Sequence, residues 1–256
     1  MEPRARTRPG LKLRAAIVTG VSRGLGEALA HALLERGYLV VGVGRSSAAR
    51  LAGPNYRFAQ AELAQAARID AMLEAPFAEL AARRPEYVCL INNAAVGAPV
   101  GIHGRMASGD IAESLAINLA APAALCNLFC RVFADDTVER RIINVSSGAA
   151  SNAMPAMSGY CVAKAGLEML TRVLAAETQG ERFRAVTIRP GVIDTGMQEQ
   201  MRSQPKEVLP GVALFEGFHK GGQLVAPDTT ASVIVEKLVA APVEHGRTYT
   251  YQELAA

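Results

Sequence analysis

The feature that most constrains the fold is a regular alternation along the chain from Ala15 onward. Short runs rich in β-branched residues alternate with longer stretches rich in Ala and Leu that have helical periodicity. We expect strands at 15–19, 39–43, 56–59, 88–91, 141–145, 185–188 and 248–251, with helices in the gaps. Runs such as A-A-I-V-T have apolar residues at successive positions, as strands covered by helices on both faces require. Right-handed crossovers then give an α/β fold, a doubly wound parallel sheet in a three-layer αβα arrangement.

Composition and charge indicate one domain preceded by a basic tail. The 256 residues contain no linker rich in Pro, Gly and Ser and no internal repeat, so we expect a single domain over 15–256. Most of the excess positive charge behind the formal net charge of +3 lies in residues 1–14, which we expect to be a disordered tail. The tail has no aromatic residue and no amphipathic period, so we expect no nucleic-acid and no membrane partner. The chain shows no signal peptide and no run of about 18 apolar residues, which favours a soluble, cytoplasmic protein.

The four cysteines, Cys89, Cys126, Cys130 and Cys161, lie in apolar segments and are expected to be buried thiols. Cys126 and Cys130 are four residues apart on a predicted helix, the spacing of a shared metal ligand pair. No histidine and no second cysteine pair stands nearby, so no metal site is expected.

The segment 194–225 is the one irregular region. Pro205, Pro210 and the glycines at 211, 217, 221 and 222 punctuate it, and it also carries the large apolar residues Met197, Met201, Leu214, Phe215 and Phe218. Such a segment is either a mobile substrate lid or a surface loop whose apolar residues dock on the domain, and the sequence leaves both open.

A glycine-rich turn follows the first predicted strand. The run T-G-V-S-R-G-L-G places Gly20, Gly24 and Gly26 directly before a helical stretch. Glycines there let the backbone approach a pyrophosphate, and the helix N-terminus presents N–H groups and a partial positive charge. Glycine-rich turns also join strands to helices for steric reasons alone, but the strand–turn–helix context favours a dinucleotide bound by a Rossmann-type domain.

The end of the second predicted strand bears on which dinucleotide is bound. NAD-selective proteins place a carboxylate there for the ribose hydroxyl, whereas this chain has Gly44, Arg45 and Ser46. Arg45 and Arg23 can pair with the additional 2′-phosphate of NADP(H) through charge-assisted hydrogen bonds. We therefore expect NADP(H); the alternative is that both arginines are solvated surface residues.

Tyr160 and Lys164 form the pattern Y-x-x-x-K, with side chains on one face of a predicted helix. A free phenol has a pKa of about 10, and a nearby ammonium stabilises the phenolate, so Lys164 can tune Tyr160 for proton exchange. Thirteen residues upstream of Tyr160, a predicted strand ends at Ser146 and Ser147. Ser147 is the better candidate to hold a substrate oxygen and Ser146 to be structural, although one sequence leaves the reverse assignment open.

These motifs together resemble those of the short-chain dehydrogenase/reductase family. The turn spacing G-x-x-x-G-x-G, N-N-A-A at 92–95, Asn118 in A-I-N-L-A, the serine pair, Y-x-x-x-K and R-P-G-V-I-D-T at 189–195 follow the family's order. The resemblance covers residues 15–195. Two positions depart from it: Ala95 replaces the usual glycine, and Glu62 replaces the usual aspartate before Leu63.

The resemblance implies an oxidoreductase that delivers hydride from a nicotinamide to a carbonyl carbon. Tyr160 would protonate the oxygen held by Ser147, while Asn118, a water and Lys164 resupply the proton. Asn118, Ser147, Tyr160 and Lys164 are thus the implied catalytic residues. The implied cofactor-binding residues are Gly20, Ser22, Arg23, Gly24, Leu25, Gly26, Arg45, Ser46, Glu62, Leu63, Asn93, Ala94, Tyr160, Lys164, Pro190, Gly191, Val192 and Thr195.

The C-terminal segments resemble those of sepiapterin reductases and the related benzil reductases, whose tails end in a short aromatic strand over the substrate pocket. Where sepiapterin reductases have an aspartate that anchors the pterin, this chain has Thr250, with Glu253 the nearest acid. A pterin needs a buried acceptor for its amino groups, so an aromatic ketone or diketone is favoured as substrate. Met154, Met157, Met197, Phe215 and Phe218 are candidates for its apolar pocket, although each could equally be core.

Two other functions stay open on the sequence. One is a 3-oxoacyl carrier-protein reductase, whose chains usually end in a V-D-G-G tail that is absent here. The other is a non-catalytic NADPH sensor, which would be expected to have lost Tyr160 or Lys164. Small residues on the predicted helices 111–133 and 157–178 permit close packing across a two-fold axis, or equally within the chain; in the family these helices form the dimer, so a homodimer, or a tetramer, is expected.

Overall fold

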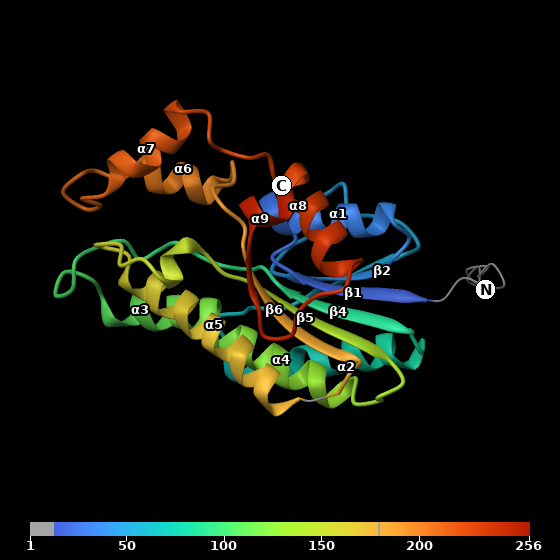
Figure 1. Cartoon of the computed structure of the whole chain (residues 1–256). Coiled ribbons are helices and arrows are strands. Elements are labelled where there is room, and N and C mark those ends of the chain that lie inside the picture. Colours follow the sequence, from blue (N-terminus) through green and yellow to red (C-terminus); the bar gives the residue numbers. More distant parts are fainter. Residues whose placement is uncertain (1–12, 179) are drawn as a thin grey trace.

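The computed structural model describes residues 13–178 and 180–256. Within them, seven strands form one parallel sheet in the order β3-β2-β1-β4-β5-β6-β7, as Figure 1 shows for its central strands. The strands are β1 (Arg14–Thr19), β2 (Leu39–Gly44), β3 (Tyr56–Gln60), β4 (Tyr87–Asn92), β5 (Glu139–Val145), β6 (Phe183–Arg189) and β7 (Thr248–Thr250). The expected doubly wound parallel sheet is confirmed. Of the predicted basic tail, residues 1–12 lie outside the described residues, and Arg14 belongs to β1.

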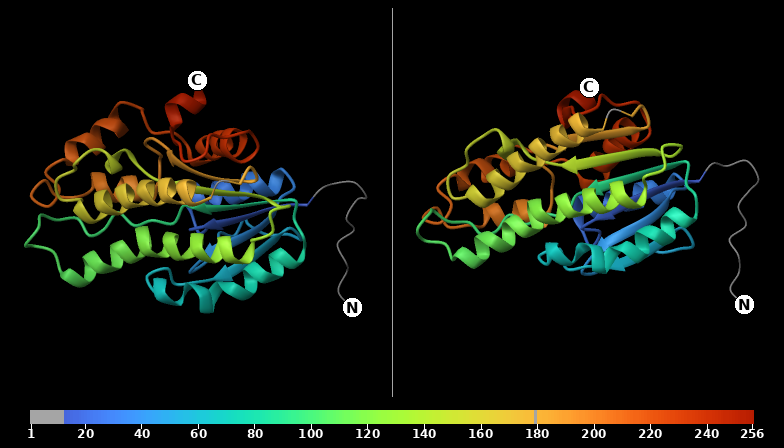
Figure 2. Two further views of the ribbon diagram at one scale, coloured as in Figure 1. Left: turned by 60° about the horizontal axis from the view of Figure 1, so that its bottom comes forward. Right: turned by 90° about the horizontal axis from the view of Figure 1, so that it is seen from below.

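Two layers of helices cover the sheet, as Figures 1 and 2 show. One layer holds α1 (Gly24–Glu35), α8 (Pro227–Ile234) and the π-helical turn η4 (Val235–Val239). The other holds α2 (Ile69–Ala82), α4 (Ala121–Val132) and α5 (Ser158–Glu177). The remaining helical elements are η1 (Ala66–Arg68), α3 (Ser108–Leu115), the π-helical turn η2 (Ala116–Ala120), η3 (Gly148–Ala150), α6 (Gly196–Arg202), α7 (Val212–Lys220) and α9 (Tyr251–Ala255).

The strands form because their side chains are apolar on both faces. Ile17 and Leu90 pack into the core beneath α2 and α4, whereas their neighbours Val18 and Ile91 pack beneath α1 and α8, and none of the four is exposed. Burial of each such side chain contributes about 1.5–3 kcal/mol of stability. The sheet is therefore a rigid platform, and its strand order reverses between β1 and β4, which opens a crevice at their carboxyl ends.

The C-terminal strand is shorter than its sequence indicates. Tyr251 was expected to end a strand over 248–251, but it begins α9. Thr250 is the reason, because its hydroxyl accepts a hydrogen bond from the backbone N–H of Glu253 while the Glu253 carboxylate accepts one from the backbone N–H of Thr250. This reciprocal capping box starts a helix at the point where the strand pattern continues.

The irregular segment 194–225 contains two helices, α6 and α7, which lie beyond the carboxyl ends of the strands in Figure 1. Met201 and Phe215 are buried between them and the body, at 1% and 9% exposure. These two side chains pack on the domain, while Leu214 is half exposed.

One helical run in the described part of the chain, Ser108–Val132, is long and apolar enough to cross a membrane by length and composition, with a mean hydropathy of 1.5. Asn118, Asn127 and Arg131 interrupt this run, so it is not the continuous apolar stretch that the sequence analysis excluded. The run consists of α3, η2 and α4, and it carries Leu125 and Phe129 into the core beneath the sheet. Packing in the domain accounts for these apolar residues.

Cys89 and Cys126 are fully buried, and Cys130 and Cys161 are half-buried. Burial raises the pKa of the Cys89 thiol to about 12, so it stays neutral. Among the described residues, no group of three or more His, Cys, Asp or Glu side chains is placed to hold a metal ion.

Candidate active site

The glycine turn lies at the carboxyl end of β1 and leads into α1. Gly20 and Gly24 have positive φ angles of 76° and 62°, which side chains rarely adopt. At Gly26, an added Cβ would lie 2.2 Å from the Gly20 carbonyl oxygen, so only glycine lets the turn close on the helix. Arg23 precedes α1 without capping it by its side chain, which leaves the first N–H groups of the helix without a side-chain acceptor. This is a cradle for an anionic group.

The segment after β4 braces this turn. The Thr19 hydroxyl accepts hydrogen bonds from the backbone N–H groups of Asn93 and Ala94, at 3.0 and 2.9 Å. The Asn93 amide donates to the Thr19 carbonyl at 2.9 Å. Asn92 points instead into the sheet, where it donates to the Asn144 side chain at 2.8 Å. Asn93 therefore shapes the turn, and Asn92 joins β4 to β5.

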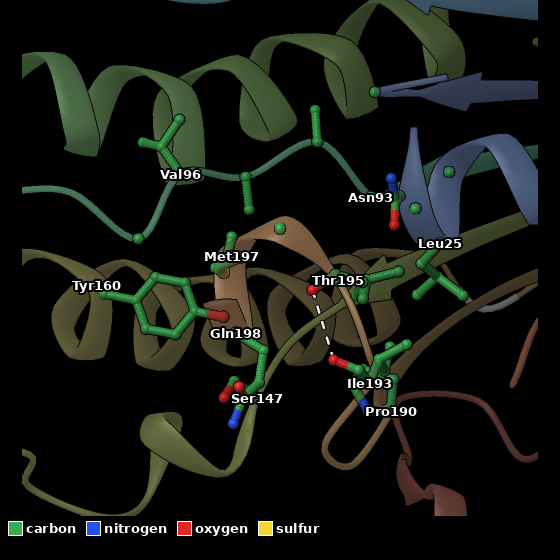
Figure 3. Close-up of a pocket in the computed structure, with 18 of the residues that line it drawn as sticks. Leu25, Asn93, Val96, Ser147, Tyr160, Pro190, Ile193, Thr195, Met197 and Gln198 are labelled. Atoms are coloured by element: carbon green, nitrogen blue, oxygen red, sulfur yellow. Dashed lines mark hydrogen bonds between the residues drawn. The ribbon is translucent and has the colours of Figure 1, made fainter. Parts of the chain in front are cut away.

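A single cavity of about 1540 Å³ connects the glycine turn to Tyr160. All eighteen cofactor-binding residues predicted from the sequence line it, and Ser147 does too. In Figure 3, Tyr160 lies at one end of the view, Leu25 and Asn93 lie at the other, and Thr195 lies between them. A pocket for one drug-sized ligand is usually at most about 1,000 Å³, so this cavity has room for a dinucleotide and a second molecule. The residues present therefore fit a dinucleotide.

At the ends of β2 and β3 this cavity is lined by Arg45, Ser46, Glu62 and Leu63, with Arg23 on the glycine turn. Arg45 is exposed, and its guanidinium forms no ion pair among the described residues. Leu63 is 7% exposed, so it anchors the loop after β3 in the core. A cationic side chain thus stands where an NAD-selective protein would present a carboxylate.

Tyr160 and Lys164 both project from α5, and burial favours the neutral form of each. Burial raises the pKa of Tyr160, and a hydrogen bond with Ser147 partly offsets this. Burial lowers the pKa of Lys164 to about 8. The Lys164 ammonium donates to the Val145 carbonyl at 2.7 Å and lies 5.5 Å from the centre of the Tyr160 ring. Ser147, rather than Lys164, is the group whose hydrogen bond lowers the phenol pKa in this structure.

The two serines at the end of β5 have different surroundings. Ser147 caps η3, where its hydroxyl accepts from the Ala149 N–H at 3.2 Å, and it lines the cavity beside Tyr160. Ser146 is 2% exposed and donates to Glu168 at 2.9 Å. The geometry therefore places Ser147 within reach of a substrate and commits Ser146 to the protein interior.

Asn118 does not line the cavity, and its side chain is fully occupied. Its amide accepts from the Val96 N–H at 2.8 Å and donates to the Val96 carbonyl at 2.8 Å and to Ser114 at 3.3 Å. It lies in η2, where the i→i+5 pattern disturbs the regular carbonyl ladder. A water bridging to Lys164 would therefore have to be held by the main-chain oxygen of Asn118, not by its amide.

The end of the cavity beyond Tyr160 is lined by large apolar side chains, most of them methionine or phenylalanine. These are Met154, Met157, Met197, Met201, Leu214, Phe215 and Phe218. Met157 is only 3% exposed, so it serves both the core and the cavity wall. Pocket and core, which the sequence analysis gave as alternatives for this residue, are therefore compatible.

Sequence reasoning missed polar residues at this end. Gln198 is 6% exposed, donates to the Phe215 carbonyl at 3.0 Å and accepts from Arg202 at 2.9 Å, which fixes α7 on α6. Gln252 on α9 also lines the cavity, close to Gly191. No sequence signal marks either glutamine, because Gln198 lies in the irregular segment 194–225 and Gln252 lies just after the strand expected over 248–251.

Comparisons with known proteins identify the family of the chain. The sequence model of the family described as short chain dehydrogenase matches residues 14–206. A benzil reductase ((S)-benzoin forming) of Bacillus subtilis is 31% identical over 239 residues, which cover 93% of this chain and 98% of that protein. A sepiapterin reductase of Xenopus laevis is 29% identical over 227 residues, 81% of this chain and 84% of that protein. The crystal structure of a short-chain dehydrogenase/reductase from Saccharomyces cerevisiae superposes with a TM-score of 0.81 at 22% identity, covering 94% and 98% of the two chains, which shows the fold alone.

The chain belongs to the short-chain dehydrogenase/reductase family of oxidoreductases. Within that family it belongs to the branch of benzil and sepiapterin reductases, as its motifs indicate.

Proposed function

We propose that this protein is an NADPH-dependent carbonyl reductase that converts a ketone or diketone, benzil-like or sepiapterin-like, to an alcohol. The observation that carries the proposal is the single cavity in which a glycine turn fit for a dinucleotide, the Tyr160–Ser147 pair and an apolar end wall meet. Each part alone has a structural explanation, but their union in one cavity is the arrangement that carbonyl reduction requires.

In the proposed reaction, Ser147 and Tyr160 act on the carbonyl oxygen of the substrate. The Ser147 hydroxyl, which lies near enough to lower the pKa of Tyr160, and the Tyr160 hydroxyl both contact the substrate oxygen and hold it in place. Tyr160 is neutral in this environment and therefore carries the proton that the developing alkoxide needs. When bound, the dihydronicotinamide supplies the hydride to the carbonyl carbon. Lys164 then reprotonates Tyr160 from solvent, by way of a water at the Asn118 main chain.

The preference for NADPH over NADH is argued from charge. Arg45 and Arg23 line the adenosine half of the cavity, and Ser46 adds a hydroxyl donor. A 2′-phosphate there gains charge-assisted hydrogen bonds, whereas a bare ribose hydroxyl lacks its carboxylate acceptor. We expect Arg45→Asp to reverse the preference by weakening NADPH binding.

The substrate proposal follows from the end wall. Methionine side chains adapt their shape and make favourable contacts with aromatic rings, as an aromatic ketone or diketone requires. Thr250 also lines the cavity, but a threonine has no carboxylate to bind a pterin. Its hydroxyl is also engaged in the capping box with Glu253. These features favour a benzil-like substrate over a pterin.

The test is to follow NADPH absorbance with a panel of carbonyl compounds that includes benzil, sepiapterin and a 3-oxoacyl thioester. We expect benzil to be consumed with NADPH faster than with NADH. NADPH binding without turnover of any carbonyl would favour a sensor, and turnover of the thioester alone would favour the carrier-protein reductase.

We also propose that the enzyme is a cytoplasmic homodimer. Exposed apolar side chains lie along one face of α5, at Val162, Met169 and Val173, with 58%, 51% and 41% exposure. A contiguous apolar face on a long helix is suited to self-association about a two-fold axis.

A further inference from the structure

Glu168 sits one helical turn after Lys164 on α5, and the proposed reaction gives it no role. Its side chain is 13% exposed, and both its oxygens are engaged. Oε1 accepts from Arg189 Nε at 2.8 Å and from the Ser146 hydroxyl at 2.9 Å, and Oε2 accepts from Arg189 Nη2 at 2.8 Å. A carboxylate held by two arginine nitrogens and a buried hydroxyl has a defined position.

The three partners belong to three segments that form the catalytic end of the cavity. Glu168 shares α5 with Tyr160 and Lys164. Ser146 is the neighbour of Ser147 at the end of β5. Arg189 ends β6 and directly precedes Pro190, where the loop that lines the cavity opposite Tyr160 begins. The Glu168 carboxylate thus links the helix that carries Tyr160 to the strand end that carries Ser147 and to the loop that follows β6.

This arrangement differs from an ordinary surface ion pair. Exposed pairs such as Arg131–Asp70, with both side chains 47% exposed, contribute little because water screens them. Arg189 is 27% exposed, and its hydrogen bonds with Glu168 raise its pKa, so it stays charged. Arg189 also lines the cavity, so without Glu168 its guanidinium would be free beside the place of the nicotinamide.

The geometry points to Glu168 as a positioning residue that fixes the nicotinamide loop relative to Tyr160 and Ser147 through Arg189 and Ser146. It touches neither the cavity nor a reacting group, and its effect passes through its two partners. The inference rests on the proposed carbonyl reductase function. It adds that catalysis depends on the Glu168 carboxylate, which lies outside the active-site cavity and contacts neither the substrate nor the cofactor.

The test compares Glu168→Gln with the unaltered protein. Glutamine keeps the shape and the acceptor for Ser146 but loses the charge and one acceptor for Arg189. We expect kcat for benzil reduction to fall about 10- to 100-fold, because displacements of about 1 Å at reacting groups have effects of this size. The dissociation constant of NADPH should change less than about threefold, because the phosphate contacts lie at α1 and β2. The emission of bound NADPH should shift toward that of free NADPH.

Controls separate positioning from simple loss of stability. Arg189→Lys, which keeps the charge but cannot bind both oxygens, should lower kcat in the same direction by less. The double variant Glu168→Gln/Arg189→Lys should lose less than the product of the two single losses. Asp70→Asn, which removes an exposed pair between α2 and α4, should leave kcat unchanged.

The outcomes are distinguishable. If Glu168→Gln is folded and matches the unaltered protein in kcat and in NADPH emission, Glu168 is merely structural and this inference fails alone. If both single variants are less stable but keep kcat per folded molecule, it also fails. If the unaltered protein neither binds NADPH nor consumes it with any carbonyl, the proposed function fails first and this inference falls with it.

Discussion

At the scale of single residues, the interior of this protein favours the neutral forms of its two central titratable groups. Burial raises the pKa of Tyr160 and lowers that of Lys164, so the phenol keeps its proton and the ammonium is poorly solvated. A neutral phenol is the form that donates a proton during reduction. The reverse reaction needs the phenolate, and without bound nicotinamide the site disfavours it.

Replacing Tyr160 tests the proton donor. We expect Tyr160→Phe to lower kcat for benzil reduction about 10²- to 10⁴-fold, the usual contribution of a positioned acid, while NADPH affinity changes little. Tyr38→Phe is the matched control, because the Tyr38 hydroxyl is buried without a hydrogen-bond partner among the described residues. Steady-state rates and fluorescence titrations check both; equal rates for Tyr160→Phe and the unaltered protein would refute the proposed role.

Lys164 gives the stability of the fold a pH dependence. Its folded pKa is about 8, against 10.5 for an ordinary lysine, so below pH 8 the fold carries the cost of a buried ammonium. As the pH rises from about 8 to 10.5, the folded protein loses this proton before the unfolded chain does, and stability rises. Relative to Lys164→Met, the unaltered protein should gain about 2 kcal/mol between pH 7 and pH 10, since one pKa unit is worth about 1.4 kcal/mol. Denaturant titrations measure this difference, and a constant difference would contradict it.

The sequence predicted the site residues that belong to a recognisable motif. Gly20, Tyr160 and Ser147 fall on the cavity because their spacing in the chain reflects strand ends and helix turns. Asn118 shows where such prediction fails. Its residue type and its position in the chain suit a water relay, but its side-chain amide is hydrogen-bonded to the backbone of Val96. Glu168 was missed because its partner Arg189 is 21 residues away, and only the fold brings them together.

At the scale of elements, the glycine turn depends on close contact between α1 and β1. An alanine methyl at Gly26 would meet the Gly20 carbonyl and the Asn93 amide, so the turn must open. Forced contacts of this kind cost about 1–3 kcal/mol, which corresponds to NADPH binding weakened roughly 10- to 100-fold by Gly26→Ala. Gly211→Ala is the control, because its φ is −86° and an added methyl there meets nothing within 4 Å. Equal NADPH affinities of the two variants would disprove the role of the turn.

The first half of β6, before β7 pairs with it, has a histidine in place of a neighbouring strand on one side. His245 Nδ1 accepts from the buried Ala185 N–H at 3.0 Å, and Nε2 lies 3.0 Å from the Thr178 carbonyl, so the neutral Nε2–H tautomer satisfies both. We expect His245→Ala to lower the free energy of unfolding by about 1–3 kcal/mol, because the Ala185 N–H is left unpaired. Urea titrations check this, with His31→Ala, which loses only an exposed pair with Glu35, as a control within about 0.5 kcal/mol. A loss at His245 no larger than at His31 would count against it.

The ends of elements were the least predictable features. Strand β7 ends at Thr250 because a capping box starts α9 there, although T-Y-T-Y continues a strand pattern. Likewise, the segment 194–225 forms α6 and α7 despite its prolines and glycines, since Met201 and Phe215 gain burial against the domain. Tertiary packing overrides local propensity in the segment 194–225, whereas at Thr250 a local capping box overrides the strand pattern.

At the scale of the whole molecule, the apolar face of α5 predicts self-association. Val162, Met169 and Val173 are exposed along this face, on the helix that also carries Tyr160. A charged side chain at the centre of such a face loses its hydration when a dimer forms. Across a two-fold axis it also lies close to the same charge on the partner subunit, which repels it. We expect Met169→Glu to be monomeric at micromolar concentration, while Ile102→Glu, which also replaces an exposed apolar side chain, stays dimeric. Sedimentation velocity decides between these outcomes, and a monomeric unaltered protein would show that the face of α5 does not pair.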